Sequence, residues 1–257
     1  MTDRRQRQKE QRAARLEVEK KAASRKEFRR RIIVALAIGV GLVGVLVLTT
    51  VLGNRPETLP ASYQAFREQP IACGAEAPPD VEILSFPAPE AMGLGNGPIT
   101  MTINTSCGPI VIEADPVAFP ETVNAFVFLA NQAFFDGTVF HRIAADFVIQ
   151  GGDPDASGIG GPGYRIPDEF PPEGFVYDEG VVAMANSGAG TTGSQFFIVV
   201  GDNARVLNNT FNVLGRVVTG QETLDAIEAV PTSVAPGTNE RSRPLETVYI
   251  ESIEIEG

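Results

Sequence analysis

A single run of uncharged residues divides this chain into parts that must fold in different surroundings. Residues 32–52 read IIVALAIGVGLVGVLVLTTVL, and no charged side chain interrupts them. A helix of this length, rising about 1.5 Å per residue, spans the hydrocarbon core of a bilayer, which is about 30 Å thick. We therefore expect a single transmembrane helix at 32–52. A cleaved signal peptide is the alternative, but both the polar leader and the apolar run are longer than that architecture requires.

Charge is distributed unequally on the two sides of this run. Residues 1–31 contain thirteen Lys or Arg and five Asp or Glu, whereas the whole chain has a formal net charge of −11. The basic excess predicts a cytoplasmic, helical arm at 1–31 and places the carboxyl-terminal part of the chain outside the cytoplasm. We thus expect a single-pass protein of the cell membrane. The acidic remainder is not expected to bind nucleic acid, because it would repel phosphates.

The segment after the apolar run is rich in Pro and Gly and contains one of the two cysteines of the chain. Its composition predicts an extracytoplasmic linker at 53–98. Cys73 and Cys107 both follow the predicted membrane segment, on the side where disulfides persist, so we expect them to form an intrachain disulfide. Two free thiols are the alternative. With one histidine and no CxxC motif, the chain is not expected to hold a metal ion.

Residues 99–257 alternate short apolar runs with Gly-rich turns, which predicts a mainly β domain. Ile99, Met101 and Ile103 alternate before a turn at 107–109, as in a hairpin. Pro120 begins a segment with apolar residues at helical spacing, and a second helix is expected at 221–229. A closed barrel capped by two α-helices would remove the open edges of so many strands. The further strands are expected at 139–143, 147–149, 181–185, 196–200, 212–218 and 248–255.

Two segments of this domain resemble the signatures of one enzyme family. Residues 140–153 read FHRIAADFVIQGGD, and residues 182–198 read VAMANSGAGTTGSQFFI. Both are similar to cyclophilins, the peptidyl-prolyl cis/trans isomerases, and the resemblance extends over about 99–255 in the order and spacing of that family. It implies a closed eight-stranded antiparallel barrel with two helices, and catalysis of rotation about the peptide bonds that precede proline in polypeptide clients. No cofactor is implied.

The resemblance also implies roles for individual residues. Arg142 corresponds to the catalytic arginine of the family. Val206 and Phe211 stand where family members often carry an aromatic residue and a histidine or tyrosine. The implied substrate-binding residues are those that hold the prolyl ring or the peptide backbone: Phe147, Val148, Gln150, Ala185, Asn186, Ser187, Thr191, Gln195, Phe197 and Leu207.

Other features favour structural roles. His141 lies beside Arg142, but the isomerisation transfers no proton, so we expect a structural histidine. The segment DPDASG at 153–158 is similar to the start of a calcium loop, yet the twelfth position is Tyr164 and not Glu, which favours an ordinary loop. Two functions remain open at this point: an isomerase that assists the folding of extracytoplasmic proteins, and a module that binds proline-containing segments without useful turnover.

Overall fold

The computed structural model describes residues 59–257, which form one compact unit. Within this range, no helix combines the length and the apolar character needed to cross a bilayer. The predicted basic arm at 1–31 and the predicted transmembrane helix at 32–52 lie outside the described residues.

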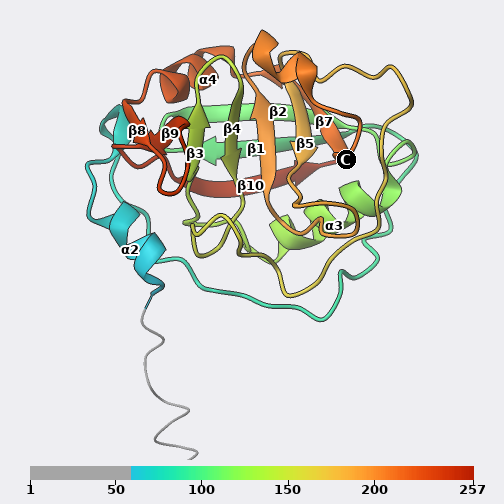
Figure 1. Ribbon diagram of the computed structural model, residues 1–257. Helices are drawn as coiled ribbons and strands as arrows, with labels where there is room; N and C mark the ends of the chain where they lie inside the picture. The colour runs from blue at the N-terminus through green and yellow to red at the C-terminus, as the bar shows by residue number, and fades with distance from the viewer. Residues whose placement is uncertain (1–58) are drawn as a thin grey trace, which may run out of the picture. The chain divides into compact units, whose positions relative to one another are not determined.

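Eight antiparallel strands form one curled sheet, in the order β10-β1-β2-β7-β5-β6-β4-β3 (Figure 1). A separate two-stranded hairpin pairs β8 with β9. The bounds of the ten strands are β1 (Ile99–Thr105), β2 (Gly108–Ala114), β3 (Arg142–Ala144), β4 (Val148–Gly151), β5 (Val181–Met184), β6 (Phe196–Val199), β7 (Val213–Thr219), β8 (Thr232–Val234), β9 (Arg241–Pro244) and β10 (Ile250–Glu256).

The expected closed barrel capped by two helices is wrong as a description of residues 59–257. The sheet is open: β10 and β3 are its edge strands, and no ladder joins them within residues 59–257. β3 has only three residues and pairs with β4, and β9 packs beside it. Val139 makes only isolated bridges, to Tyr249 and Asp153. The described residues contain three α-helices, α2 (Ala61–Arg67), α3 (Pro120–Asn131) and α4 (Gln221–Glu228), with 3-10 turns at η1 (Ala72–Gly74) and η2 (Asp202–Val206).

The main core lies between the concave side of the sheet and helices α3 and α4. The predicted alternation in β1 is confirmed, since every second residue of Ile99–Thr105 is buried. α3 begins at Pro120, as expected, and Glu169 accepts hydrogen bonds from the backbone N–H groups of Glu121 and Thr122 at 3.0 and 2.6 Å. This distant carboxylate satisfies donors that the first helical turn leaves unpaired. The helix thereby presents Phe126 to the core, stacked on Phe135 at 4.8 Å.

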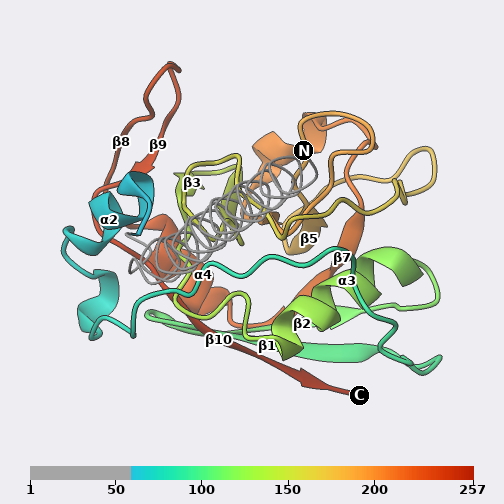
Figure 2. The ribbon, with the colours of Figure 1, turned by 90° about the horizontal axis from the view of Figure 1, so that it is seen from below.

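Residues 59–98, which lie in the range expected to be a linker, are part of the folded unit. Tyr63 and Phe66 of α2 are buried, and Phe86 packs edge-on against Phe128 of α3 with ring centroids 5.1 Å apart. A disulfide joins Cys73, at η1, to Cys107, in the turn between β1 and β2. The extended stretch after η1 runs along the domain towards α3 (Figure 2). These contacts hold the Pro-rich stretch 75–98 against the domain, and we call this stretch the strap.

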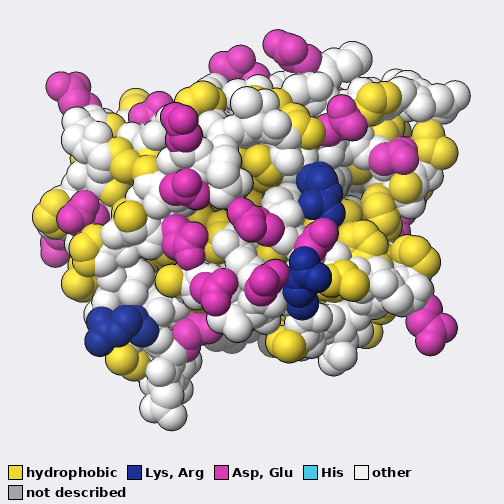
Figure 3. Space-filling view, turned by 90° about the horizontal axis from the view of Figure 1, so that it is seen from above, with side chains coloured by type: hydrophobic (Ala, Val, Ile, Leu, Met, Phe, Trp, Pro, Cys, Tyr) yellow, Lys and Arg dark blue, Asp and Glu magenta, His cyan; other side chains and the backbone are white. Residues whose placement is uncertain are grey.

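The surface of the described domain is predominantly acidic. Asp and Glu side chains are spread over the face shown in Figure 3, where Lys and Arg are few and apolar side chains line the hollows between them. The overall charge of −11 includes the basic residues of 1–31, so the domain itself is more acidic than the whole chain.

Candidate active site

Four neighbouring strands bring a row of side chains to one face of the sheet. Arg142 of β3 is directly opposite Gln150 of β4, which is opposite Phe197 of β6, which is opposite Ala183 of β5. Residues paired across antiparallel ladders project to the same face. A guanidinium, an amide and an aromatic ring therefore lie side by side, although the sequence separates Arg142 from Phe197 by more than fifty residues.

This face is apolar on one side of the row. Val148, Phe197 and Val199 form a second hydrophobic cluster, distinct from the core under α3, while the intervening Ile149 and Ile198 point into that core. Phe147 and Leu207 pack against the second cluster while partly exposed. The four residues expected to form the apolar floor, Phe147, Val148, Phe197 and Leu207, are thus in one cluster.

Phe211 forms one wall of this apolar cluster. The ring of Phe211 meets Phe197 edge-on at 5.4 Å, and its backbone oxygen accepts a hydrogen bond from the Tyr177 hydroxyl at 2.7 Å. Val206, at the end of η2, is 82% exposed and is not part of this cluster. Phe211 therefore contributes an aromatic contact to the floor.

Arg142 lies at the boundary between the apolar cluster and the polar residues. Its guanidinium carbon is 5.3 Å from the centre of the Phe147 ring, a cation–π distance, and its Nη1 donates to Gln150 Oε1 at 3.2 Å. The opposite edge of the guanidinium is paired with Glu240: Nε donates to Oε2 at 2.8 Å and Nη2 to Oε1 at 2.7 Å. The hydrogen bonds from Arg142 hold the pKa of Glu240 below its ordinary value.

Glu240 is the main site residue that the sequence did not indicate. It lies 98 residues after Arg142, outside both signature segments, in a polar stretch without apolar alternation. A single Glu in such a stretch resembles any solvated carboxylate. Only the hairpin formed by β8 and β9 brings it to Arg142.

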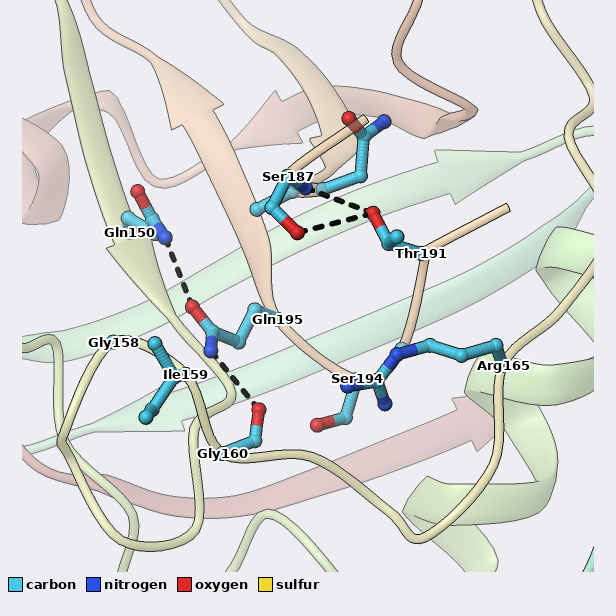
Figure 4. A pocket seen from close by; sticks show the side chains of 12 residues that line it. Gln150, Gly158, Ile159, Gly160, Arg165, Ser187, Thr191, Ser194 and Gln195 are labelled. Carbon is cyan, nitrogen blue, oxygen red and sulfur yellow. Dashed lines mark hydrogen bonds between the residues drawn. The ribbon is translucent and has the colours of Figure 1, made fainter. Parts of the chain in front are cut away.

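A chain of amide hydrogen bonds continues from Gln150, which accepts from Arg142, into a polar pocket; Figure 4 shows its contacts between Gln150, Gln195 and Gly160. Gln150 Nε2 donates to Gln195 Oε1 at 3.0 Å, and Gln195 Nε2 donates to Gly160 O at 3.0 Å and to Asp153 Oδ2 at 3.2 Å. The Asp153 carboxylate is fully buried, and burial raises its pKa to about 6. It also accepts hydrogen bonds from the backbone N–H groups of Gly158 and Gly160. The segment that resembled a calcium loop is therefore folded around its own carboxylate.

The turn at 185–193 forms the far rim of this pocket. Ala185 N donates to Gln195 O at 2.8 Å, and Asn186 Nδ2 donates to Thr210 O at 2.8 Å. Thr191 Oγ1 accepts from the backbone N–H of Ser187 at 2.9 Å. Ala185, Asn186, Ser187, Thr191, Gln195 and Gln150 all line the pocket. Arg165 lines it as well, and no sequence signal had identified this residue.

His141 is held in a neutral state next to this arrangement. Burial, together with the positive charge of Arg142, lowers its pKa to about 4. Its Nδ1 is buried and meets no hydrogen-bond partner among residues 59–257. Within the same residues, no group of three or more His, Cys, Asp or Glu side chains is arranged to hold a metal ion.

Comparison with known proteins agrees with this geometry. The family model described as cyclophilin type peptidyl-prolyl cis-trans isomerase/CLD matches residues 100–255. Peptidyl-prolyl cis-trans isomerase B of Streptomyces anulatus is 42% identical over 172 residues, covering 60% of this chain and 95% of its own length. The probable peptidyl-prolyl cis-trans isomerase A of Mycobacterium leprae is 40% identical over 171 residues, covering 61% of this chain and 91% of its own.

Solved structures show the same likeness. The crystal structure of a cyclophilin type peptidyl-prolyl cis-trans isomerase from Cryptosporidium parvum has a TM-score of 0.56 at 30% identity and covers 63% of this chain and 99% of its own. A second structure of that protein, in the presence of the dipeptide Ala-Pro, has a TM-score of 0.55 at 30% identity and covers 62% of this chain and 99% of its own. The chain belongs to the cyclophilin-type peptidyl-prolyl cis-trans isomerases.

Proposed function

We propose that this isomerase acts through Arg142, which stabilises the twisted X-Pro amide without forming a covalent bond. The observation that carries the proposal is the place of the guanidinium: it lies over Phe147 and donates to Gln150, between the apolar cluster and the polar pocket. A proline ring on the apolar side would bring its nitrogen to the guanidinium. The preceding residue would then extend along the polar side.

The isomerisation requires no covalent catalysis, only a donor placed at the prolyl nitrogen. Amide resonance sets a barrier of about 18–20 kcal/mol to rotation, and the uncatalysed reaction takes tens of seconds or longer. In the twisted state the prolyl nitrogen becomes pyramidal and its lone pair localises. A donor aimed at that lone pair binds the transition state more strongly than either planar isomer, which lowers the barrier selectively.

The ion pair with Glu240 leaves donors for this contact. A guanidinium carries five N–H groups in a rigid plane. Glu240 receives two of them and Gln150 a third. One hydrogen on Nη1 and one on Nη2 stay available, and 27% of the Arg142 side chain is exposed to solvent from which a peptide can approach.

We further propose that the remaining residues hold the peptide. Phe147, Val148, Phe197 and Leu207 would contact the prolyl ring, because they belong to one apolar cluster in which Phe147 and Leu207 are partly exposed. The Ala-Pro dipeptide used with the Cryptosporidium protein supports a ligand of this kind. The peptide backbone would be held at the pocket by Gln150, Ala185, Asn186 and Gln195, with Ser187 and Thr191 at its rim.

We place the reaction outside the cytoplasm, where the enzyme would assist the folding of proline-containing exported proteins. The disulfide between Cys73 and Cys107 supports this location, because such bonds form and persist in oxidising compartments and are rare in the cytosol.

The test is cis/trans exchange in a short X-Pro peptide, measured by NMR exchange spectroscopy with the full-length protein. Removing a donor of this kind costs about 10²- to 10³-fold in turnover. We therefore expect Arg142→Ala to lower kcat/KM to that extent and to leave thermal unfolding within a few degrees of the wild type. Exchange no faster than the uncatalysed reaction in both proteins, with peptide still bound, would instead identify a module that binds proline segments, whereas equally fast exchange in both would exclude Arg142 from the mechanism.

A further inference from the structure

Glu240 reaches the catalytic arginine from a hairpin that lies apart from the main sheet. It immediately precedes β9, and Figure 2 shows β8 and β9 standing out beside α2 and β3. Both carboxylate oxygens are used, each by a different nitrogen of Arg142, at 2.7 and 2.8 Å. Such a two-bond contact fixes the orientation of the guanidinium plane as well as its distance.

The backbone of Glu240 is itself held in place. Its carbonyl oxygen accepts from Ala235 N at 2.9 Å, and its N–H donates to Thr238 Oγ1 at 3.1 Å, so both sides of the hairpin end are tied to it. Further along β9, Ser242 is buried. The guanidinium of Arg243 lies 5.8 Å from the ring of Phe66 in α2. The carboxylate is thus presented by an anchored element.

The contact between Glu240 and Arg142 also determines which guanidinium nitrogen donates to Gln150. Since Glu240 engages Nε and Nη2, the nitrogen left to face Gln150 is Nη1. Gln150 then accepts with its oxygen and donates with its nitrogen to Gln195, which in turn donates to Asp153. A carboxylate stands at each end of this sequence: Nε and Nη2 of Arg142 donate to Glu240, whereas Nη1 of Arg142 begins the donors that lead through Gln150 and Gln195 to Asp153. Without Glu240, the end of the sequence at Arg142 would lose its fixed orientation.

Resting on the proposed role of Arg142, we propose that Glu240 is a positioning residue that holds the guanidinium plane in the orientation needed for the twisted amide. A long, flexible arginine with 27% of its side chain exposed would otherwise sample several rotamers. Glu240 touches no reacting atom. It acts by raising the fraction of molecules in which the free N–H groups of Arg142 face the cleft.

Two variants and a matched control test this role in the full-length protein. Glu240→Ala removes both acceptors, and Glu240→Gln keeps one acceptor but removes the charge. Glu251→Gln removes the same charge from an exposed position on β10. Small misplacements of a catalytic group lower the rate by up to about 100-fold. We therefore expect Glu240→Ala to lower kcat about 10- to 100-fold while its KM stays within about twofold of the wild type. The kcat of Glu240→Gln should lie between these two proteins, and that of Glu251→Gln should match the wild type.

A readout independent of turnover separates this proposal from the function of Arg142. The Nε–H signal of Arg142 in NMR spectra can be assigned by its loss in Arg142→Lys. We expect slow hydrogen exchange of this signal in the wild type and in Glu251→Gln, and an averaged, fast-exchanging signal in Glu240→Ala. If the wild type had no isomerase activity, the proposed function would be wrong. The Nε–H signal would still show whether Glu240 fixes the orientation of the Arg142 guanidinium. Unchanged or higher kcat in Glu240→Ala, or an unchanged Nε–H signal, would overturn the positioning role.

Discussion

The disulfide between Cys73 and Cys107 should stabilise the folded protein by restricting the unfolded chain. It closes a loop with a sequence separation of 34. The loss of loop entropy in the unfolded chain then corresponds to about 4 kcal/mol at 25 °C. We therefore expect the double variant Cys73→Ser, Cys107→Ser to lose up to about 4 kcal/mol of unfolding free energy.

The folded state of that variant should change little, because other contacts hold the strap. Phe86 N donates to Pro162 O at 2.8 Å, and Met92 N donates to Asn124 Oδ1 at 2.8 Å. The ring of Phe86 also packs against Phe128. The cost should thus arise mainly in the unfolded ensemble, and kcat/KM should stay within about twofold of the wild type.

Urea denaturation followed by far-UV circular dichroism measures this effect, since the chain has no tryptophan for fluorescence. With a slope of about 2–3 kcal/mol per molar urea, the midpoint should fall by about 1.5 M. Reduction of the wild type with dithiothreitol should give the same midpoint as the double variant. A loss below about 1 kcal/mol, or loss of activity in a protein that remains folded, would refute this reasoning.

Three further predictions concern the site. First, His141 should make stability depend on pH, because its folded pKa of about 4 lies below the ordinary 6.5 and the unfolded chain therefore binds the extra proton. The unfolding free energy should fall by up to about 3 kcal/mol from pH 6.5 to pH 4. A difference in unfolding free energy between wild type and His141→Phe that does not vary over this range would contradict the prediction. Second, a Cβ at Gly160 would overlap the Asp153 carboxylate, so Gly160→Ala should cost about 1–3 kcal/mol in thermal unfolding and weaken peptide binding in titrations. Gly95→Ala is the control, because a Cβ there meets open space and φ is not positive, and it should match the wild type. Third, Phe197→Ala should cost about 3–5 kcal/mol and raise KM for X-Pro peptides, because it empties the floor of the apolar cluster; unchanged KM in a folded variant would exclude Phe197 from the proline site.

The sequence contained enough information to predict those parts of the fold that depend on local pattern. The alternation of Ile99, Met101 and Ile103 predicted β1, and Pro120 marked the first residue of α3. The two signature segments identified the strands that carry Arg142, Gln150 and Phe197. In each case the information lies within a few neighbouring residues, where side-chain period or helix capping decides the structure.

What could not be predicted depends on contacts between distant residues. The edge strands β3 and β10 do not pair, and β9 packs beside β3. Neither feature can be predicted from a local sequence pattern. α2 has only seven residues, too few for a helical period, and it is held by the burial of Tyr63 and Phe66. β8 and β9 are short and polar, with no apolar alternation to indicate strands. Glu240 was missed for the same reason, since its role exists only once the hairpin has formed.

Replacing the guanidinium of Arg142 while keeping a positive charge separates its geometry from its charge. Arg142→Lys retains one positive charge but cannot reproduce the fork that engages Glu240 and Gln150 at once and still leaves donors towards the cleft. In NMR exchange spectroscopy on an X-Pro peptide, we expect its kcat/KM to fall at least about 100-fold, close to that of Arg142→Ala. A lysine variant with exchange rates near those of the wild type would show that charge alone is sufficient, and would contradict the mechanism proposed for Arg142.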